Sequence, residues 1–253
     1  MAYEKLATGV TPALIIYLLD VSASMRKPLG GKRRIDVVAD ALEAAIRQMV
    51  FRSAKGSRIS PRYRIGMLAY SQHVYDLLDG IRPVDQVARK GIPELEPMQT
   101  TDTAKAFAWA EKFLNADLPN LQNCPAPLIC HMTDGEFTGE DPEPIARRIM
   151  QIAVPDGNVL VENIFISDQS DKIFADPVQQ DVRNWPGVLP DTRLKNKYVH
   201  KLRAISSPLP ATYRTMMLEM GYNIDPNALM LLPGTSPELV AMGFQMSTAT
   251  PVR

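Results

Sequence analysis

Three oxygen-bearing side chains stand at alternate positions after the first apolar run of this sequence. Residues 14–19 are aliphatic or tyrosine, and Asp20, Ser22 and Ser24 follow them. Because side chains alternate across an extended chain, these three can point the same way. A carboxylate and two hydroxyls offer only oxygen ligands, which suit a hard cation such as Mg²⁺ and not zinc. The stretch predicts part of a metal site.

A second carboxylate, Asp134, follows another apolar run, residues 128–132. In open α/β sheets, ligands bind beyond the carboxyl ends of the strands, where the strand order reverses. If the two runs are neighbouring parallel strands, Asp20 and Asp134 meet in one crevice. Thr101 and Thr103, just ahead of a helical pattern, supply a third source of hydroxyl oxygen.

The elements that must position these residues alternate between strands and helices. Apolar residues at helical spacing, as in residues 35–49, separate the apolar runs. This alternation predicts a doubly wound α/β fold, with a mostly parallel six-stranded sheet and helices on both faces. The order 3-2-1-4-5-6 places strands 1 and 4 side by side, and strand 3 is an antiparallel edge strand. The predicted strands, in chain order, are residues 14–19, 63–70, 73–78, 128–132, 159–166 and 228–232.

Composition excludes several classes of function. Lysine plus arginine and aspartate plus glutamate both number 28, so the formal net charge of zero gives no sign of a nucleic-acid-binding surface. The short basic cluster at residues 31–34 is interpreted as a solvated loop. Two cysteines, at no zinc or redox spacing, favour a reducing compartment. The first residues lack signal-peptide features, and no apolar stretch is long enough to span a membrane, so we expect a cytoplasmic protein.

One stretch does not follow the alternation of strands and helices. Residues 168–197 contain three prolines and no clean periodicity. A loop of this length inside a compact domain is uncommon. We therefore expect a single domain over residues 1–253, with an ordered insertion at about 168–197 after strand 5. The insertion begins at the carboxyl end of strand 5, on the same edge of the sheet as the predicted metal site. Trp185 is either an anchor for a partner or a core residue that packs the insertion against the domain.

Taken together, Asp-x-Ser-x-Ser after strand 1, a threonine ahead of a helix and "TDG" after strand 4 resemble the von Willebrand factor A (VWA) domain. In that family this constellation is the metal-ion-dependent adhesion site (MIDAS). The resemblance covers residues 11–166 and extends more loosely to about residue 246. It implies a metal site made of Asp20, Ser22, Ser24, Thr101 and Asp134.

The family pattern also implies a role for each ligand. The hydroxyls of Ser22 and Ser24 bind the ion directly, whereas Asp20 and Asp134 act mostly through bound water. Thr101 is the mobile ligand, direct in one conformation and water-bridged in the other. The family usually has glycine before this threonine, and here Thr100 stands there, so a register that uses Thr100 and Thr103 remains the alternative.

Neutral hydroxyls leave a divalent ion with an affinity for one more anionic oxygen. We therefore expect a Mg²⁺ (or Mn²⁺) site that binds an Asp or Glu side chain of a protein partner, with no enzymatic activity.

In one alternative, Asp171, Asp176 or Asp181 of the insertion occupies the ion internally. In another, the protein is a Mg²⁺-dependent phosphohydrolase; against this, no second aspartate stands two residues after Asp20, and no P-loop is present. His131, inside a strand, is expected to be a buried, hydrogen-bonded residue. A scaffold with a vestigial metal site is the third reading.

Among VWA proteins, the chain looks most like the stand-alone bacterial domains associated with tellurium resistance, a stress response. That resemblance implies a kinase, a phosphatase or an AAA-type ATPase as partner.

Overall fold

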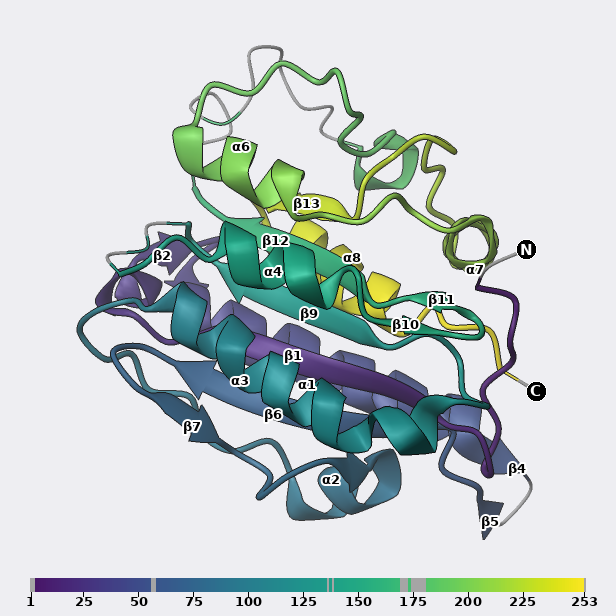
Figure 1. The fold of residues 1–253 in the computed structure, drawn as a ribbon. Coiled ribbons are helices and arrows are strands. Elements are labelled where there is room, and N and C mark those ends of the chain that lie inside the picture. Colours follow the sequence, from purple (N-terminus) through teal and green to yellow (C-terminus); the bar gives the residue numbers. More distant parts are fainter. Residues whose placement is uncertain are drawn as a thin grey trace.

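A seven-stranded sheet forms the centre of the molecule, in the order β13-β12-β9-β1-β6-β7, with β8 also paired to β6 (Figure 1). It is seen in a computed structural model that describes residues 3–55, 58–135, 137, 139–168, 173 and 181–252. All pairs from β13 to β6 are parallel, and β7 and β8 are antiparallel to β6. The strands are β1 (Ala13–Asp20), β6 (Tyr63–Tyr70), β7 (Val74–Asp76), β8 (Arg82–Pro83), β9 (Leu128–Thr133), β12 (Leu160–Ile166) and β13 (Leu231–Gly234).

Helices cover both faces of this sheet. Helix α1 packs on α8 over one face, and α3 packs on α4 over the other (Figure 1). Strands β1, β9 and β12 are buried at every position, as expected for parallel strands covered on both sides. The helices are α1 (Arg34–Ser53), α2 (Val84–Lys90), α3 (Thr103–Asp117), α4 (Glu143–Ile149), α6 (Lys197–Ala204), α7 (Ala211–Glu219) and α8 (Pro237–Ser247).

Short elements join these parts. Three are 3₁₀ turns: η1 (Ala23–Arg26), η2 (Leu118–Leu121) and η3 (Val182–Asn184). The remaining strands form two-stranded hairpins: β2 (Pro28–Leu29) with β3 (Lys32–Arg33), β4 (Ala54–Lys55) with β5 (Arg58–Ile59), and β10 (Ala153–Val154) with β11 (Gly157–Asn158).

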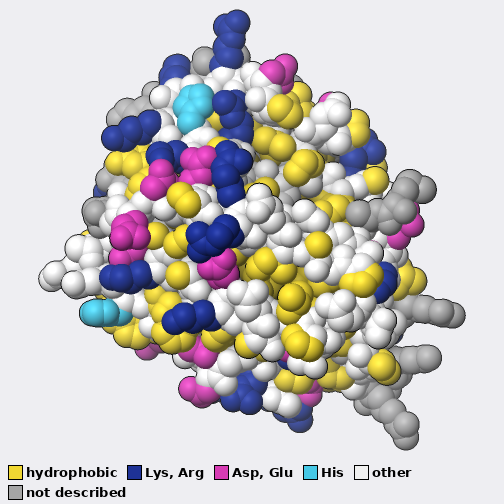
Figure 2. All heavy atoms as spheres, viewed as in Figure 1, with side chains coloured by type: hydrophobic (Ala, Val, Ile, Leu, Met, Phe, Trp, Pro, Cys, Tyr) yellow, Lys and Arg dark blue, Asp and Glu magenta, His cyan; other side chains and the backbone are white. Residues whose placement is uncertain are grey.

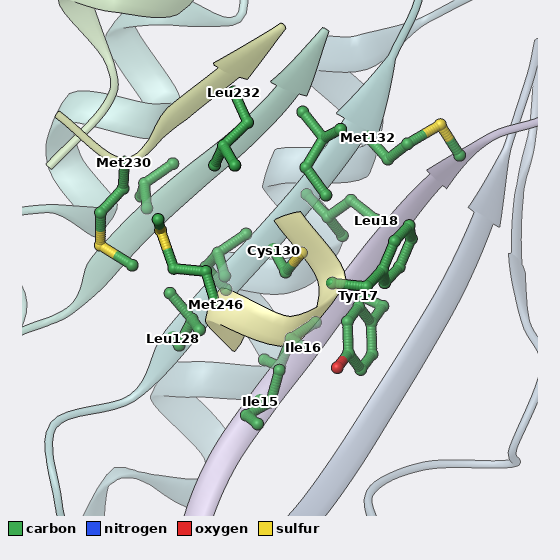
Figure 3. Packing of buried hydrophobic residues seen from close by; sticks show 14 of the residues in the cluster. Ile15, Ile16, Tyr17, Leu18, Leu128, Cys130, Met132, Met230, Leu232 and Met246 are labelled. Carbon is green, nitrogen blue, oxygen red and sulfur yellow. The ribbon is translucent and has the colours of Figure 1, made fainter. Parts of the chain in front are cut away.

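Buried side chains fill the space on each side of the sheet. Figure 3 shows part of this core, where Tyr17 of β1, Cys130 of β9, Leu232 of β13 and Met246 of α8 lie in one region. The hydroxyl of Tyr17 lies 2.7 Å from that of Ser247 at the end of α8, so this buried phenol has a hydrogen-bond partner.

The predicted fold class and strand order are confirmed, with two differences of detail. The sheet has seven strands, not six, because the chain after β7 returns along the same edge as β8. The last strand also begins later than the predicted residues 228–232. Leu229 pairs instead with Val188 and Pro208, outside the main sheet, and β13 starts at Leu231. Pro233, which lacks an N–H, is tolerated because β13 is an edge strand.

The basic cluster at residues 31–34 is not simply the solvated loop that was expected. Gly30 and Gly31 have φ values of 59° and 85°, which a two-residue turn of type I′ requires, and they close the β2–β3 hairpin. Lys32 and Arg33 are exposed on this hairpin, but Arg34 begins α1 and is buried. The hairpin thus places Arg34 in the interior of the protein and leaves Arg33 at the surface.

The described part of residues 168–197 packs against the rest of the chain. Trp185 is only 5 % exposed and belongs to the hydrophobic core. The suggestion that Trp185 is a surface anchor for a partner is therefore wrong, and the core alternative holds.

The surface carries charges of both signs. On the face drawn in Figure 2, basic and acidic side chains are interspersed. Ion pairs also connect neighbouring elements: Arg148 of α4 pairs with Glu111 of α3, and Lys201 of α6 pairs with Asp141, which precedes α4. Within the described part of the chain, no helix has the length and apolar character that a membrane crossing requires.

Candidate metal centre

Asp20 ends β1 and is fixed through both of its carboxylate oxygens. Oδ1 accepts the backbone N–H of Ser22 at 2.8 Å, and Oδ2 accepts the hydroxyl of Thr133 at 2.7 Å. The second bond crosses between strands, because β1 and β9 are parallel neighbours with Leu19 opposite Met132. The carboxyl ends of the two strands therefore meet, as the strand order predicted. These two hydrogen bonds fix the orientation of the Asp20 carboxylate.

The two serines lie beside each other in the turn that follows. The hydroxyl oxygens of Ser22 and Ser24 are 2.9 Å apart, and Ser22 precedes η1. Ser22 is 2 % exposed, whereas Ser24 is partly accessible. Two hydroxyl oxygens at this separation can occupy neighbouring positions around one cation.

The loop that carries Thr101 runs alongside the serine turn. The backbone N–H of Met98 donates to Val21, and that of Ala23 donates to Gln99 at 3.4 Å. Thr101 is 4 % exposed. The threonine and serine loops are thus held together by backbone hydrogen bonds. The next residue, Asp102, caps α3 by accepting from Lys105 N–H.

The Thr133–Gly135 turn after β9 supplies the second carboxylate. Asp134 is 8 % exposed, and the backbone N–H of Gly135 donates to the hydroxyl of Thr133 at 2.9 Å. Gly135 has φ 90°, and a Cβ there would lie 2.1 Å from the ring of Phe165. Glycine in "TDG" is therefore required by both backbone conformation and space.

Arg34 is the site residue that the sequence analysis did not identify. Its guanidinium donates to Oδ2 of Asp134 at 3.2 Å and to Oδ1 of Asp168 at 2.8 Å. Its position was a usable signal, because residue 34 precedes Val38 by four positions and so continues the buried stripe of α1. The first turn of the helix after strand 1 also lies at the carboxyl edge of a doubly wound sheet.

The electrostatics of the centre favour a bound cation. Burial, and then the nearby Asp134 carboxylate, raise the pKa of Asp20 from 3.8 to about 7. Hydrogen bonds from Thr133 and Ser22 oppose that increase. Two carboxylates in a desolvated place are costly unless positive charge accompanies them, and Arg34, which contacts Asp134, supplies one positive charge for the two. Together with the hydroxyls of Ser22 and Ser24, this donor set consists of hard oxygen atoms and fits a divalent ion of the Mg²⁺ type.

A chain of buried hydrogen bonds connects β6, β9 and β12. Tyr70 Oη lies 2.7 Å from Nε2 of His131, and Nδ1 of His131 lies 2.8 Å from Oδ1 of Asn163. Asn163 uses its NH₂ group toward Ser206, so Oδ1 is the acceptor, His131 carries its proton on Nδ1, and Tyr70 donates to Nε2. Burial lowers the pKa of His131 to about 4. His131 is thus a neutral, fully paired core residue, as predicted.

Of the three aspartates that could occupy the ion internally, the structure describes Asp181. Asp171 and Asp176 lie outside the described residues. Asp181 caps η3, accepting the N–H of Arg183 at 3.0 Å and the side chain of Asn184 at 2.7 Å. Across the described residues, no three His, Cys, Asp or Glu side chains are grouped as a metal site. The two carboxylates of this centre would therefore act together with hydroxyls.

Comparison with known protein families agrees with the fold and with the motifs. The family model described as von Willebrand factor type A domain matches residues 15–136, just under half of the chain. These residues include Asp20, Ser22, Ser24, Thr101 and Asp134. The match and the fold together support a VWA domain. A comparison with the curated proteins gives no match.

Solved structures with the same fold are distant in sequence. The von Willebrand factor type A protein from Catenulispora acidiphila is 15% identical, with a TM-score of 0.54, over 98% of this chain and 47% of that one. Proximal thread matrix protein 1 from the mussel byssus, solved with a zinc-occupied MIDAS motif, is 13% identical with a TM-score of 0.57, over 94% of this chain and 47% of that one. The PilB minor pilin from Streptococcus sanguinis is 11% identical with a TM-score of 0.55, over 95% and 62%. This chain spans about half the length of the first two proteins. At these identities the likeness concerns the fold.

Proposed function

We propose that this protein is a metal-dependent protein-interaction module. Ser22, Ser24 and Thr101 would hold a Mg²⁺ or Mn²⁺ ion directly, and Asp20 and Asp134 would act through bound water. When bound there, the ion supplies a coordination position for a carboxylate from an Asp or Glu of a partner. The observation that carries this proposal is the convergence of Asp20 with the serine turn and the Thr133–Gly135 turn, across two adjacent parallel strands.

The residues of the chain divide this task between them. Asp20 holds the serine turn through Ser22 N–H, so the two hydroxyls are already in place before an ion arrives. Thr133 fixes the rotamer of Asp20. Because Ser24 is partly accessible whereas Asp20 is fully buried, a partner would approach the hydroxyl side of the site. The carboxylates would remain behind the ion.

We propose no catalytic step. His131 has no exposed surface and both of its ring nitrogens are engaged, which leaves it unsuited to act as a general base. The finer expectations from the sequence also remain proposals: a bacterial, cytoplasmic domain of the tellurium-resistance type, with a kinase, a phosphatase or an AAA-type ATPase as partner.

Isothermal titration calorimetry with Mg²⁺ and Mn²⁺ tests the metal site. We expect the wild-type protein to bind one ion, and Asp20→Asn and Ser22→Ala to lose binding. Asp40→Asn and Thr215→Ala are matched controls, because Asp40 pairs with Lys32 on the surface and the Thr215 hydroxyl donates to Ala211 in its own helix. Binding that persists in Asp20→Asn would contradict the site.

A pull-down with and without chelator tests the interaction. Partners captured with Mg²⁺ but lost with chelator and with Asp20→Asn would support the module. Partners retained equally in every condition would favour a scaffold with a vestigial site. Asp20-dependent turnover of a panel of phosphate esters would favour the phosphohydrolase alternative.

A further inference from the structure

A buried arginine holds one of the two carboxylates of the metal centre. The side chains of Arg34 and Asp134 are 5% and 4% exposed, and their closest atoms are 3.2 Å apart. The other partner, Asp168, lies two residues after the end of β12, and its side chain is 45% exposed. The guanidinium therefore lies between the inner carboxylate Asp134 and the half-exposed carboxylate Asp168.

Helix geometry alone does not explain this position. Arg34 is the first residue of α1, and the N-terminal end of a helix favours negative side chains over positive ones. Its Nε atom is also buried, with no hydrogen-bond partner among the described residues. A buried N–H without a hydrogen-bond partner is energetically unfavourable. Arg34 is thus held in place by the two carboxylates, against both of these effects.

We infer that Arg34 is an internal counter-cation that sets the metal affinity of this site. The inference rests on the proposed function of the site as a metal centre. With no ion bound, the guanidinium offsets the charge of Asp134 and keeps the buried pair of carboxylates tolerable. With an ion bound, the same positive charge repels it, so the site binds the ion more weakly than its oxygen atoms alone would allow.

The burial of Arg34 separates this role from direct partner binding. A carboxylate from solution cannot reach a side chain that is 5% exposed and already engaged by two carboxylates. Arg33, the preceding residue, shows the contrast. It is 45% exposed and pairs with Asp36 and Glu96 on the surface. The two arginines carry the same charge, but only Arg34 touches a residue of the metal centre.

Calorimetric titration of the metal-free protein with Mn²⁺, repeated in the variants, tests the inference. The guanidinium contacts Asp134, so removing its positive charge removes its repulsion of the ion, and Arg34→Gln should tighten binding by about tenfold. Arg33→Gln, with the same loss of charge, should change the affinity less than about twofold, because exposed charges are screened. Arg34→Lys, which keeps the charge, should bind nearly as the wild type does.

A second readout does not depend on calorimetry. Arg34→Gln leaves Asp134 buried without its cation, which is strongly destabilising. The variant should therefore unfold at a lower temperature in chelator and gain more from Mn²⁺ than the wild type gains. If Arg34→Gln does not fold, the double variant Arg34→Gln/Asp168→Asn takes its place, because it leaves one carboxylate without its cation and not two. It should still bind the ion more tightly than the wild type, by a smaller factor, because the lost charge of Asp168 is half-exposed and screened.

The outcomes distinguish the inference from the proposed function. If folded wild-type protein and all folded variants fail to bind Mn²⁺ or Mg²⁺, the metal centre itself is wrong and the inference falls with it. If the wild type binds, but neither Arg34→Gln nor the double variant binds more tightly, only the role of Arg34 is overturned. Equal tightening in Arg33→Gln would also overturn it.

Discussion

The hydroxyl of Thr133 donates to Oδ2 of Asp20 across 2.7 Å and so joins the ends of β9 and β1. Both residues are buried, and the same hydroxyl accepts the N–H of Gly135. One threonine thus orients the carboxylate on one strand and shapes the turn that carries Asp134 on the other. The geometry of the candidate metal centre depends on this contact.

Replacing Thr133 by valine keeps the shape of the side chain and removes its hydroxyl. We expect the free energy of unfolding to fall by about 1–3 kcal/mol, because a buried carboxylate oxygen and a buried N–H both lose their partner. Mn²⁺ affinity should fall as well, since Asp20 is no longer held in one rotamer. Urea denaturation and calorimetry check the two effects. Thr133→Ser restores the hydroxyl and should restore most of both, and a Thr133→Val protein as stable as the wild type would contradict the assigned role.

Asp20→Asn should stabilise the metal-free protein at pH 8 while abolishing its response to metal. Because the folded-state pKa of Asp20 is about 7, above its ordinary 3.8, its contribution to stability is present at low pH and is lost as the pH rises through 7. Asparagine has no such ionisation, so we expect a gain of about 1–3 kcal/mol at pH 8, less than the shift alone implies because one acceptor is altered.

Thermal unfolding in chelator at pH 6 and pH 8 measures this difference. The gain should shrink at pH 6, where the wild-type carboxyl is largely protonated. Asp40→Asn on the surface should change stability by less than about 0.5 kcal/mol at either pH. A destabilised Asp20→Asn protein at pH 8 would show that the hydrogen bonds of Asp20 outweigh its desolvation.

The buried His131 predicts loss of stability in mild acid. Its pKa is lowered to about 4 by burial, whereas the unfolded chain titrates near 6.5. Between these values the unfolded state binds the extra proton, so stability is present above about pH 6.5 and is lost as the pH falls toward 4. From pH 7 to pH 5 the contribution of His131 should fall by about 2 kcal/mol.

Comparison with His131→Gln separates the pH-dependent contribution of His131 to stability from the opposite contribution of Asp20. The difference in unfolding free energy between wild type and His131→Gln should favour the wild type more at pH 7 than at pH 5. A difference that does not change with pH would contradict the neutral, Nδ1-protonated state assigned to His131.

Gly135→Ala should destabilise the protein more than Gly31→Ala does. Both glycines have positive φ, but a Cβ at Gly31 meets nothing within 4 Å, whereas at Gly135 it meets the ring of Phe165. We expect about 1 kcal/mol for Gly31→Ala, from backbone strain alone, and at least about twice that for Gly135→Ala. Chemical denaturation measures both. Phe165→Leu in the Gly135→Ala background should recover part of the difference, and no recovery would show that the ring is not the obstacle.

Much of the fold could be predicted from local patterns. The predicted strand at residues 63–70 coincides with β6, and the runs ending at Asp20 and Asp134 became adjacent parallel strands. The same patterns failed where pairing partners decide the outcome. Leu229 is apolar enough for the last strand, but it pairs with Val188 and Pro208, which no periodicity in residues 228–232 could reveal.

By itself, the sequence determined which oxygen atoms stand at the carboxyl edge of the sheet, because alternation and strand order follow from local hydrophobic patterns. Only the tertiary structure decided which positively charged side chain lies next to these oxygen atoms. Arg33 and Arg34 are chemically identical neighbours, and the hairpin that precedes α1 turns one toward solvent and the other onto Asp134 and Asp168. The physical reason is that a buried ion pair depends on the direction and the distance between side chains remote in sequence, and residue type alone does not encode either of them.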